Sequence, residues 1–225
     1  MTAMQGEIEI VKDVAEEQMA ELEETVCRHP LNREVLYRIL AYCVEERTLE
    51  DLEQEVASWP SFKAATQNQY RLAEHLVRAK GLEEIERDAQ GAVVDPRDTE
   101  GLDEDALDEL VCGISYRTTD TGLLFVERHR PKARLVELLQ LAPERTDVYI
   151  ELLEFVRAQP RAYRDIEKLL QGRPVLKTIV DGTSRTMQPS VFVDKLERAG
   201  ALVWNGGWCL TEEGEAFLQD MKTSE

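Results

Sequence analysis

The chain has 225 residues, of which 43% are hydrophobic and 32% charged, and its formal net charge is −18. This composition is typical of a globular protein with one large or two small domains and excludes an intrinsically disordered chain. Because no apolar stretch has membrane-spanning length and residues 1–9 lack a signal-peptide pattern, we expect a cytoplasmic protein without membrane association. Four widely spaced cysteines favour free thiols over a zinc or redox site: Cys27, Cys43, Cys112 and Cys209.

The negative charge is concentrated in two segments. Residues 1–26 contain eight acidic residues and one basic residue, and residues 82–110 contain twelve and two, so together they account for −17 of the −18. The remaining residues are nearly neutral, and the total charge therefore does not exclude nucleic acid as a partner. The second segment contains Gly91 and Gly101 and is predicted to be a solvated insertion.

The first acidic segment has the periodicity of an amphipathic helix. Its apolar residues recur at three- and four-residue steps: Ile8, Val11, Ala15, Met19, Leu22 and Val26. His29 and Pro30 are predicted to end this helix. The apolar face either lies across its own domain or pairs with a second copy in a homodimer, and the first alternative is favoured because two heptads are short for a coiled coil.

The chain contains an internal repeat. Residues 30–42 and 143–155 both begin with proline, which suits the first turn of a helix, and they place apolar residues at matching positions. Further helices are predicted at matching places, 48–57 and 68–80 in the first copy and 161–170 and 188–199 in the second.

The last block of each copy matches most closely. An aromatic residue, a threonine, a glycine and a phenylalanine recur at three-residue steps: Tyr116, Thr119, Gly122 and Phe125, then Trp208, Thr211, Gly214 and Phe217. Before the second block, Asn205 and Gly206 supply residues that tolerate the positive φ of a tight hairpin turn. Thr211 is predicted to cap a terminal helix.

Three helices followed by a hairpin that ends in Thr-x-x-Gly before a short helix resemble the winged helix-turn-helix superfamily. The aromatic-x-x-Thr-x-x-Gly pattern is similar to the wing strand of MarR- and PadR-type bacterial regulators, and the resemblance covers most of residues 30–218. It implies a mostly α fold with small β wings, made of two tandem winged-helix domains from an internal duplication after an N-terminal amphipathic helix. The expected boundaries are 1–27 for the helix, 28–127 for the first domain with its acidic wing insertion at about 86–110, and 128–220 for the second.

The sequence offers few reactive groups. His29, His75 and His129 lack the spacing of metal ligands, and no GxSxG, Walker A or GxGxxG motif occurs. Cys27 and His29 are close in sequence but lack an evident orienting partner. We therefore predict a protein that is not an enzyme and that uses neither cofactor nor metal.

Polar residues around the predicted third helices are candidates for DNA binding, since a recognition helix reads base edges and flanking cations hold phosphates. The candidates are Lys63, Asn68, Gln69, Arg71, His75 and Arg78 in the first copy, Arg128, Arg130, Lys132 and Arg134 between the copies, and Lys177, Ser184, Arg185, Thr186 and Gln188 in the second. The alternative for each helix residue is an ordinary solvated face. The cations at 128–134 have a further alternative, which is pairing with the acidic insertion.

Two features favour a protein partner over DNA. Residues 58–67 and 171–187, between the second and third helices, exceed a helix-turn-helix turn of three or four residues, and the wing tip at 205–207 has no cation. Tandem winged helices also serve as protein-interaction modules, as in subunits that bind kleisin-type partners or build sorting complexes. Trp204 and Trp208 are then candidate partner-binding anchors. The sequence predicts a DNA-associated transcriptional regulator, with an acidic tandem winged-helix adaptor as the alternative.

Overall fold

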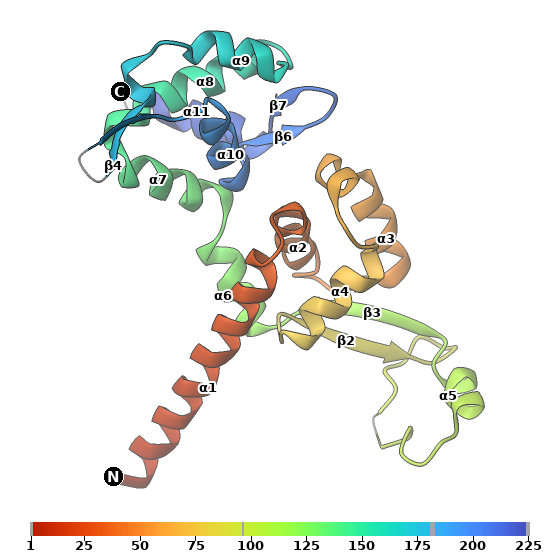
Figure 1. Ribbon diagram of the computed structural model, residues 1–225. Coiled ribbons are helices and arrows are strands. Elements are labelled where there is room, and N and C mark those ends of the chain that lie inside the picture. Colours follow the sequence, from red (N-terminus) through yellow and green to blue (C-terminus); the bar gives the residue numbers. More distant parts are fainter. Residues whose placement is uncertain (1, 96, 181–182, 224–225) are drawn as a thin grey trace. The chain divides into compact units, whose positions relative to one another are not determined.

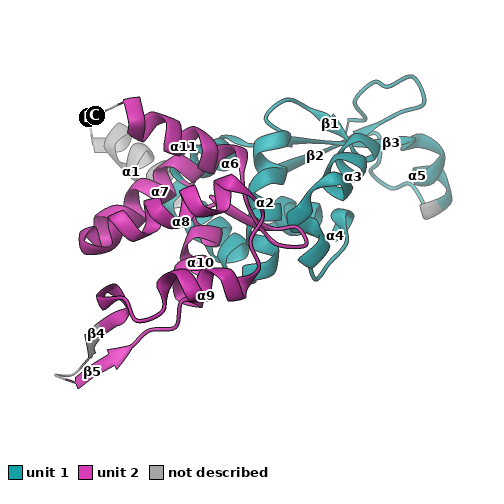
Figure 2. Cartoon of the chain, turned by 90° about the horizontal axis from the view of Figure 1, so that it is seen from above, with its two compact units in different colours: residues 1–128 teal, residues 129–225 magenta. Residues whose placement is uncertain are grey.

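The computed structural model describes residues 2–95, 97–180 and 183–223, and it describes side-chain surroundings for 15–95, 97–103, 105–177 and 183–223. The chain divides into two compact units, residues 1–128 and residues 129–225 (Figure 2). Each unit is mostly helical and contains small antiparallel sheets. The prediction of a mostly α fold with small β elements is therefore confirmed.

Unit 1 begins with helices and ends with a hairpin and one more helix (Figure 1). Its elements are α1 (Thr2–Cys27), α2 (Pro30–Tyr42), β1 (Arg47–Thr48), α3 (Leu49–Ser58), the 3₁₀ helix η1 (Pro60–Ala64), α4 (Gln69–Arg78), β2 (Leu82–Arg87), α5 (Glu104–Leu110), β3 (Gly113–Thr118) and α6 (Asp120–Arg128). Thr48 and Asn68 cap α3 and α4, because their side chains accept hydrogen bonds from the third backbone N–H that follows.

The strands of unit 1 form one antiparallel sheet in the order β1-β3-β2. Arg47 lies opposite Tyr116, and Leu82 lies opposite Thr118. Most of the acidic segment lies in the loop of the β2–β3 hairpin (Figure 1). This loop starts after Arg87, later than the predicted insertion, because β2 continues to that residue. The loop is also partly helical, since it contains α5.

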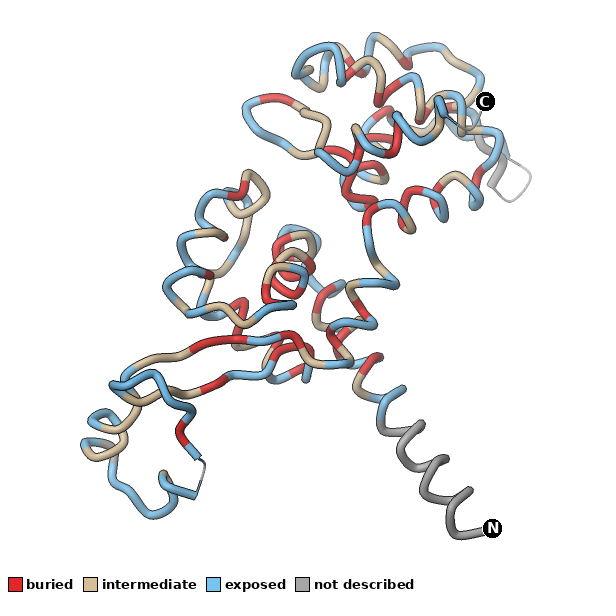
Figure 3. The backbone as a smooth tube through the Cα atoms, turned by 180° about the vertical axis from the view of Figure 1, so that it is seen from behind, coloured by how far each residue is buried: buried red, intermediate tan, exposed pale blue. Residues whose placement is uncertain are grey.

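Helix α1 belongs to the core of unit 1. Met19, Leu22 and Val26 are buried, and they join the core that α2, α3 and α4 build (Figure 3). A Cβ added at Gly81 would lie 2.7 Å from Leu22 Cδ1, so α1 packs closely on the segment between α4 and β2. The described apolar face of α1 therefore lies across its own unit, while the side chains of Ile8 and Val11 lie outside the described residues.

Unit 2 also ends with a hairpin and one more helix. Its elements are α7 (Pro131–Leu141), η2 (Pro143–Arg145), α8 (Thr146–Ala158), α9 (Tyr163–Leu170), η3 (Pro174–Leu176), β4 (Lys177–Val180), β5 (Thr183–Thr186), α10 (Ser190–Arg198), β6 (Leu202–Trp204), β7 (Trp208–Leu210) and α11 (Glu212–Thr223). The β6–β7 hairpin turns at Asn205 and Gly206 as expected, with φ +73° at Gly206.

Two parts of unit 2 differ from the sequence prediction. The β4–β5 hairpin lies between α9 and α10, in the segment that was predicted only to be longer than a helix-turn-helix turn. The basic stretch at 128–134 is not a simple connection, because it contains the end of α6 and the first turn of α7. Pro131 begins α7, and Leu135 and Leu138 bury its apolar face.

The same hydrogen bonds recur after the last hairpin of each unit. In unit 1, Thr119 Oγ1 donates to the carbonyl of Lys80 (2.6 Å) and accepts from the N–H of Gly122 (3.1 Å). In unit 2, Thr211 Oγ1 donates to the carbonyl of Gly200 (2.7 Å) and accepts from the N–H of Gly214 (3.0 Å). Lys80 and Gly200 both adopt positive φ, at +60° and +81°. Thr119 thus joins α6 to the turn after α4, and Thr211 joins α11 to the turn after α10.

An arginine also recurs at the edge of each hairpin. The Arg47 guanidinium lies 4.9 Å from the ring centroid of Tyr42, and that of Arg161 lies 3.8 Å from the ring centroid of Phe155. Arg47 pairs with Tyr116 of β3, and Arg161 pairs with Trp208 of β7 through an isolated bridge. Arg47 therefore joins the end of α2 to β3, and Arg161 joins the last turns of α8 to β7.

Candidate macromolecular interface

The exposed face of α4 carries two arginines that share one carboxylate. Arg71 Nη1 lies 2.6 Å from Glu74 Oε2, and Arg78 pairs with the other oxygen of Glu74. The hydrogen bond from Arg71 is the main reason that the pKa of Glu74 lies below its usual value. Both arginine side chains remain largely exposed, at 60% and 65%, but the face they form is partly neutralised.

The other DNA-binding candidates around α4 have structural roles or lie apart from this face. Asn68 uses its carboxamide oxygen to cap α4, and Gln69 donates to the carbonyl of Glu53 (3.4 Å). His75 is half-buried, and Lys63 is exposed on η1. The structure therefore brings Arg71 and Arg78 together but does not assemble the whole predicted group into one basic surface.

The cations at 128–134 are engaged within their own units. Arg128 Nη1 pairs with Glu23 of α1 (3.0 Å), and Lys132 Nζ pairs with Asp220 of α11 (2.5 Å). Arg134 is buried and donates to the carbonyl of Arg198 (2.7 Å), whereas Arg130 is exposed. Arg128 and Lys132 therefore pair with carboxylates outside the acidic loop, and not with the loop that the sequence analysis gave as the alternative partner.

Unit 2 carries a second set of basic residues. Lys177, Ser184, Arg185 and Thr186 lie exposed on the β4–β5 hairpin, and Gln188 is exposed just before α10. The sequence analysis missed three further cations on α9 and α10: Arg164, Lys168 and Lys195. Within the described part of the chain, no ion pair involves Arg164, Lys168, Lys177, Arg185 or Lys195. The i, i+4 spacing of Arg164 and Lys168 was visible in the sequence, but the absence of ion pairs to these cations within the described residues was not.

The two tryptophans of the β6–β7 hairpin differ in exposure. Their rings form an edge contact with centroids 5.4 Å apart. Trp204 is 48% exposed, whereas Trp208 is half-buried and packs against the core of unit 2. Trp204 is therefore the one of the pair that is available to a partner.

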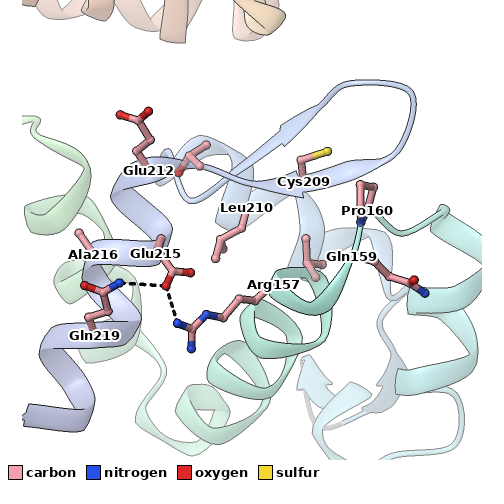
Figure 4. A pocket seen from close by; sticks show the side chains of 11 residues that line it. Arg157, Gln159, Pro160, Cys209, Leu210, Glu212, Glu215, Ala216 and Gln219 are labelled. Atoms are coloured by element: carbon pink, nitrogen blue, oxygen red, sulfur yellow. Dashed lines mark hydrogen bonds and ion pairs between the residues drawn. The ribbon is translucent and has the colours of Figure 1, made fainter.

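A pocket of about 530 Å³ lies in unit 2 between the end of α8, the end of β7 and α11 (Figure 4). An ion pair crosses it, with Arg157 Nη2 2.5 Å from Glu215 Oε1. Gln219 donates to the same oxygen (3.0 Å), and this bond and that of Arg157 hold the pKa of Glu215 below its usual value. The pocket is therefore open, and apolar side chains such as Val156 and Leu210 line it beside this ion pair.

Unit 1 has a groove of about 710 Å³ between the end of α2, the end of β3 and α6. Four aliphatic side chains line it: Val44, Val77, Leu82 and Leu123. Val44 is 46% exposed and Leu123 is 39% exposed. Arg117 at the rim pairs with Glu83 (2.8 Å).

A partly buried polar cluster stabilises the base of the acidic loop. The Glu46 carboxylate accepts hydrogen bonds from Ser115 Oγ (2.5 Å) and from Arg87 Nε (2.9 Å) and Nη2 (2.5 Å). Arg87 Nη1 in turn donates to the carbonyl of Gly91 (2.6 Å). The bonds from Ser115 and then Arg87 hold the pKa of Glu46 below its usual value.

Glu46→Gln is expected to speed amide hydrogen exchange in residues 88–112 and to destabilise unit 1 by about 2 kcal/mol at neutral pH, because a neutral amide binds Arg87 more weakly. Since the pKa of Glu46 is lowered from 4.5, its contribution is present above that pH and is lost as the pH falls through the lower folded-state value. Urea midpoints measured across this range should therefore converge for the variant and the natural chain. Glu45→Gln is the control, because Glu45 is mostly exposed; equal effects of both changes would contradict the role of the cluster.

The titratable side chains of the described residues include one deeply buried thiol. Burial raises the pKa of the Cys43 thiol to about 12, so this thiol stays protonated at neutral pH. Among the described residues, no group of three or more His, Cys, Asp and Glu side chains is placed to hold a metal ion. In the same part of the chain, no helix is both long and apolar enough to cross a membrane.

Comparisons with protein-family models, with curated proteins and with solved structures found no match for this chain.

Proposed function

We propose that this chain is a non-enzymatic adaptor made of two winged-helix domains that arose by duplication, and that it binds a protein partner. The shared order of helices and hairpin, the β1-β3-β2 sheet of unit 1 and the recurring threonine bonds support the winged-helix architecture. The recurring Arg47 and Arg161 contacts support the duplication. Free thiols at all four cysteines support a reducing compartment such as the cytoplasm.

The observation that carries the proposal is the charge of the α4 face. In a winged-helix domain α4 is the recognition helix, which must approach phosphates. Here Glu74 binds both of its arginines, and the elements that pack against α4, α3 and β2, carry further exposed carboxylates: Glu50, Asp51, Glu53, Glu83 and Glu84. Residues 1–128 hold 30 of the 45 acidic residues and 13 of the 27 basic residues. Such a surface repels a nucleic acid backbone and attracts a basic polypeptide.

A second candidate function is DNA binding through unit 2. Residues 129–225 hold the remaining 15 acidic and 14 basic residues, so this unit is nearly neutral. The exposed cations of α9 and of the β4–β5 hairpin form no ion pair within the described residues and are therefore available to phosphates. This function would be that of a DNA-associated regulator in which unit 1 recruits a protein.

Fluorescence anisotropy of labelled random-sequence duplex DNA separates the two candidates. We expect no binding by the full chain at about 150 mM salt, and weak, salt-sensitive binding at most at low salt. Any low-salt binding should be lost in Lys177→Glu/Arg185→Glu and unchanged in Arg71→Glu/Arg78→Glu. Binding at about 150 mM salt that Arg71→Glu/Arg78→Glu weakens tenfold would show that α4 contacts DNA, and would overturn the adaptor proposal.

A further inference from the structure

The tip of the β6–β7 hairpin contains an asparagine that is followed by a glycine. The chain has three asparagines: Asn32, Asn68 and Asn205. Only Asn205 precedes a glycine, because the other two are followed by Arg33 and Gln69. A glycine has no Cβ, so its backbone nitrogen can approach the preceding carboxamide with little steric hindrance. The local sequence therefore makes Asn205 the asparagine of this chain that is most prone to attack by its own backbone.

The structure leaves this Asn-Gly pair open to the reaction. Asn205 is exposed, and a Cβ built at Gly206 would have no neighbour within 4 Å. Among the described residues, the N–H of Gly206 donates no hydrogen bond, so no acceptor holds this nitrogen in place. The strands on either side of the tip have only three residues each. Water therefore reaches the tip, and no packed neighbour of Gly206 opposes a change of its backbone conformation.

The carboxamides of the other two asparagines are fixed by structural hydrogen bonds. Asn32 is buried, and its carboxamide donates to Thr66 Oγ1 (2.9 Å) and accepts from the N–H of Thr66 (2.9 Å). The carboxamide oxygen of Asn68 accepts the N–H of Arg71 (2.9 Å) as the cap of α4. Both residues are therefore internal controls for the reactivity of Asn205.

We propose that Asn205 is a site of spontaneous deamidation, which adds a negative charge to the tip of the β6–β7 hairpin. The backbone nitrogen of Gly206 loses its proton and forms a bond to Cγ of Asn205. The Cγ–Nδ2 bond breaks, and the side-chain nitrogen leaves as ammonia after it has taken up that proton. Water then adds to one of the two carbonyls of the resulting succinimide and breaks the bond between that carbonyl and the ring nitrogen. The products are aspartate and isoaspartate, and in the second the main chain runs through Cγ.

The modification changes the surface that Trp204 presents to a partner. Trp204 is 48% exposed and directly precedes Asn205, so the new carboxylate lies beside this candidate partner-binding side chain. The tip at 205–207 has no other charge, and deamidation therefore makes it acidic and unfavourable for phosphates. Isoaspartate also lengthens the main chain within the tip, which opposes the pairing of Trp204 with Trp208. The inference goes beyond the adaptor function and does not rest on it, since it requires only this hairpin.

The test follows all three asparagines in one sample of the full natural chain, incubated for several weeks at physiological pH and temperature. Mass spectrometry of tryptic peptides measures them separately, because the peptides 29–33, 64–71 and 199–222 each contain one asparagine. A parallel sample in guanidinium chloride gives the rates in the unfolded chain. Asn205→Gln is the blocked variant, since the longer side chain closes a larger ring far more slowly. Asn205→Asp is the chromatographic standard for the aspartate product.

We expect Asn205 to deamidate at rates of the same order in the folded and the unfolded chain. The rate should rise with pH, because the attacking nitrogen must lose its proton, and Asn32 and Asn68 should be strongly protected in the folded chain. Ion exchange should resolve a more acidic species from the natural chain but not from Asn205→Gln. Protection of Asn205 in the folded chain to the level of Asn32 would overturn the inference. An acidic species that forms in equal amount from Asn205→Gln would overturn it as well.

Discussion

Gly122→Ala is expected to destabilise unit 1 by about 3 kcal/mol, because the new methyl group would meet backbone atoms. A Cβ at this position would lie 2.2 Å from the carbonyl oxygen of Gly81, and that oxygen also accepts the N–H of Thr119. Relief of the overlap therefore requires α6 to move away from the turn that its capping threonine holds. Urea denaturation followed by circular dichroism measures the loss.

Gly214→Ala should destabilise unit 2 for the same reason, since its Cβ would lie 2.6 Å from the carbonyl oxygen of Ala201. Gly113→Ala is the matched control, because its Cβ would have no neighbour closer than Arg87 Cβ at 4.0 Å, and we expect a change within about 0.5 kcal/mol. If Gly122→Ala were as mild as the control, the close packing of α6 on the α4–β2 turn would be wrong.

Leu22→Ala is expected to destabilise unit 1 by about 3 kcal/mol, because it removes a fully buried side chain and leaves a cavity between α1 and the rest of the core. The loss should not depend on protein concentration, since α1 packs within its own unit. Glu21→Ala, on the exposed face of the same helix, is the control for helix propensity. A midpoint that rises with protein concentration would instead indicate that α1 stabilises a dimer.

The sequence predicted the local elements of the fold well where short-range chemistry determines them. The helix that Thr211 caps and the Asn205-Gly206 turn follow from capping and turn preferences, and both are present. The β4–β5 hairpin was missed because residues 177–186 have no alternating apolar pattern, and β5 is exposed throughout. Helix α7 was not predicted, because its first turn is rich in cations and resembles a connecting segment, although Leu135 and Leu138 have helical spacing.

Which side chains of the candidate interface contact one another could be predicted only in part. The Arg71, Glu74 and Arg78 network has helical i, i+3 and i, i+4 spacing, so the sequence contained the signal. The pairs of Arg128 with Glu23 and of Lys132 with Asp220 join residues 105 and 88 positions apart, and only tertiary structure reveals them. The same holds for the groove, because Val44 and Leu123 meet only once α6 packs beside the end of α2.

Site-specific photo-crosslinking in the source cells tests most directly whether unit 1 binds a protein rather than DNA. The photoreactive residue p-benzoylphenylalanine would replace Leu124 beside the groove, Arg71 on α4 or, as a control, the exposed Leu141 of α7. We expect a discrete protein adduct from position 124 that is lost when Val44→Arg is added, and no nuclease-sensitive adduct from position 71. A nuclease-sensitive adduct from position 71, with no protein adduct from position 124, would contradict the adaptor function.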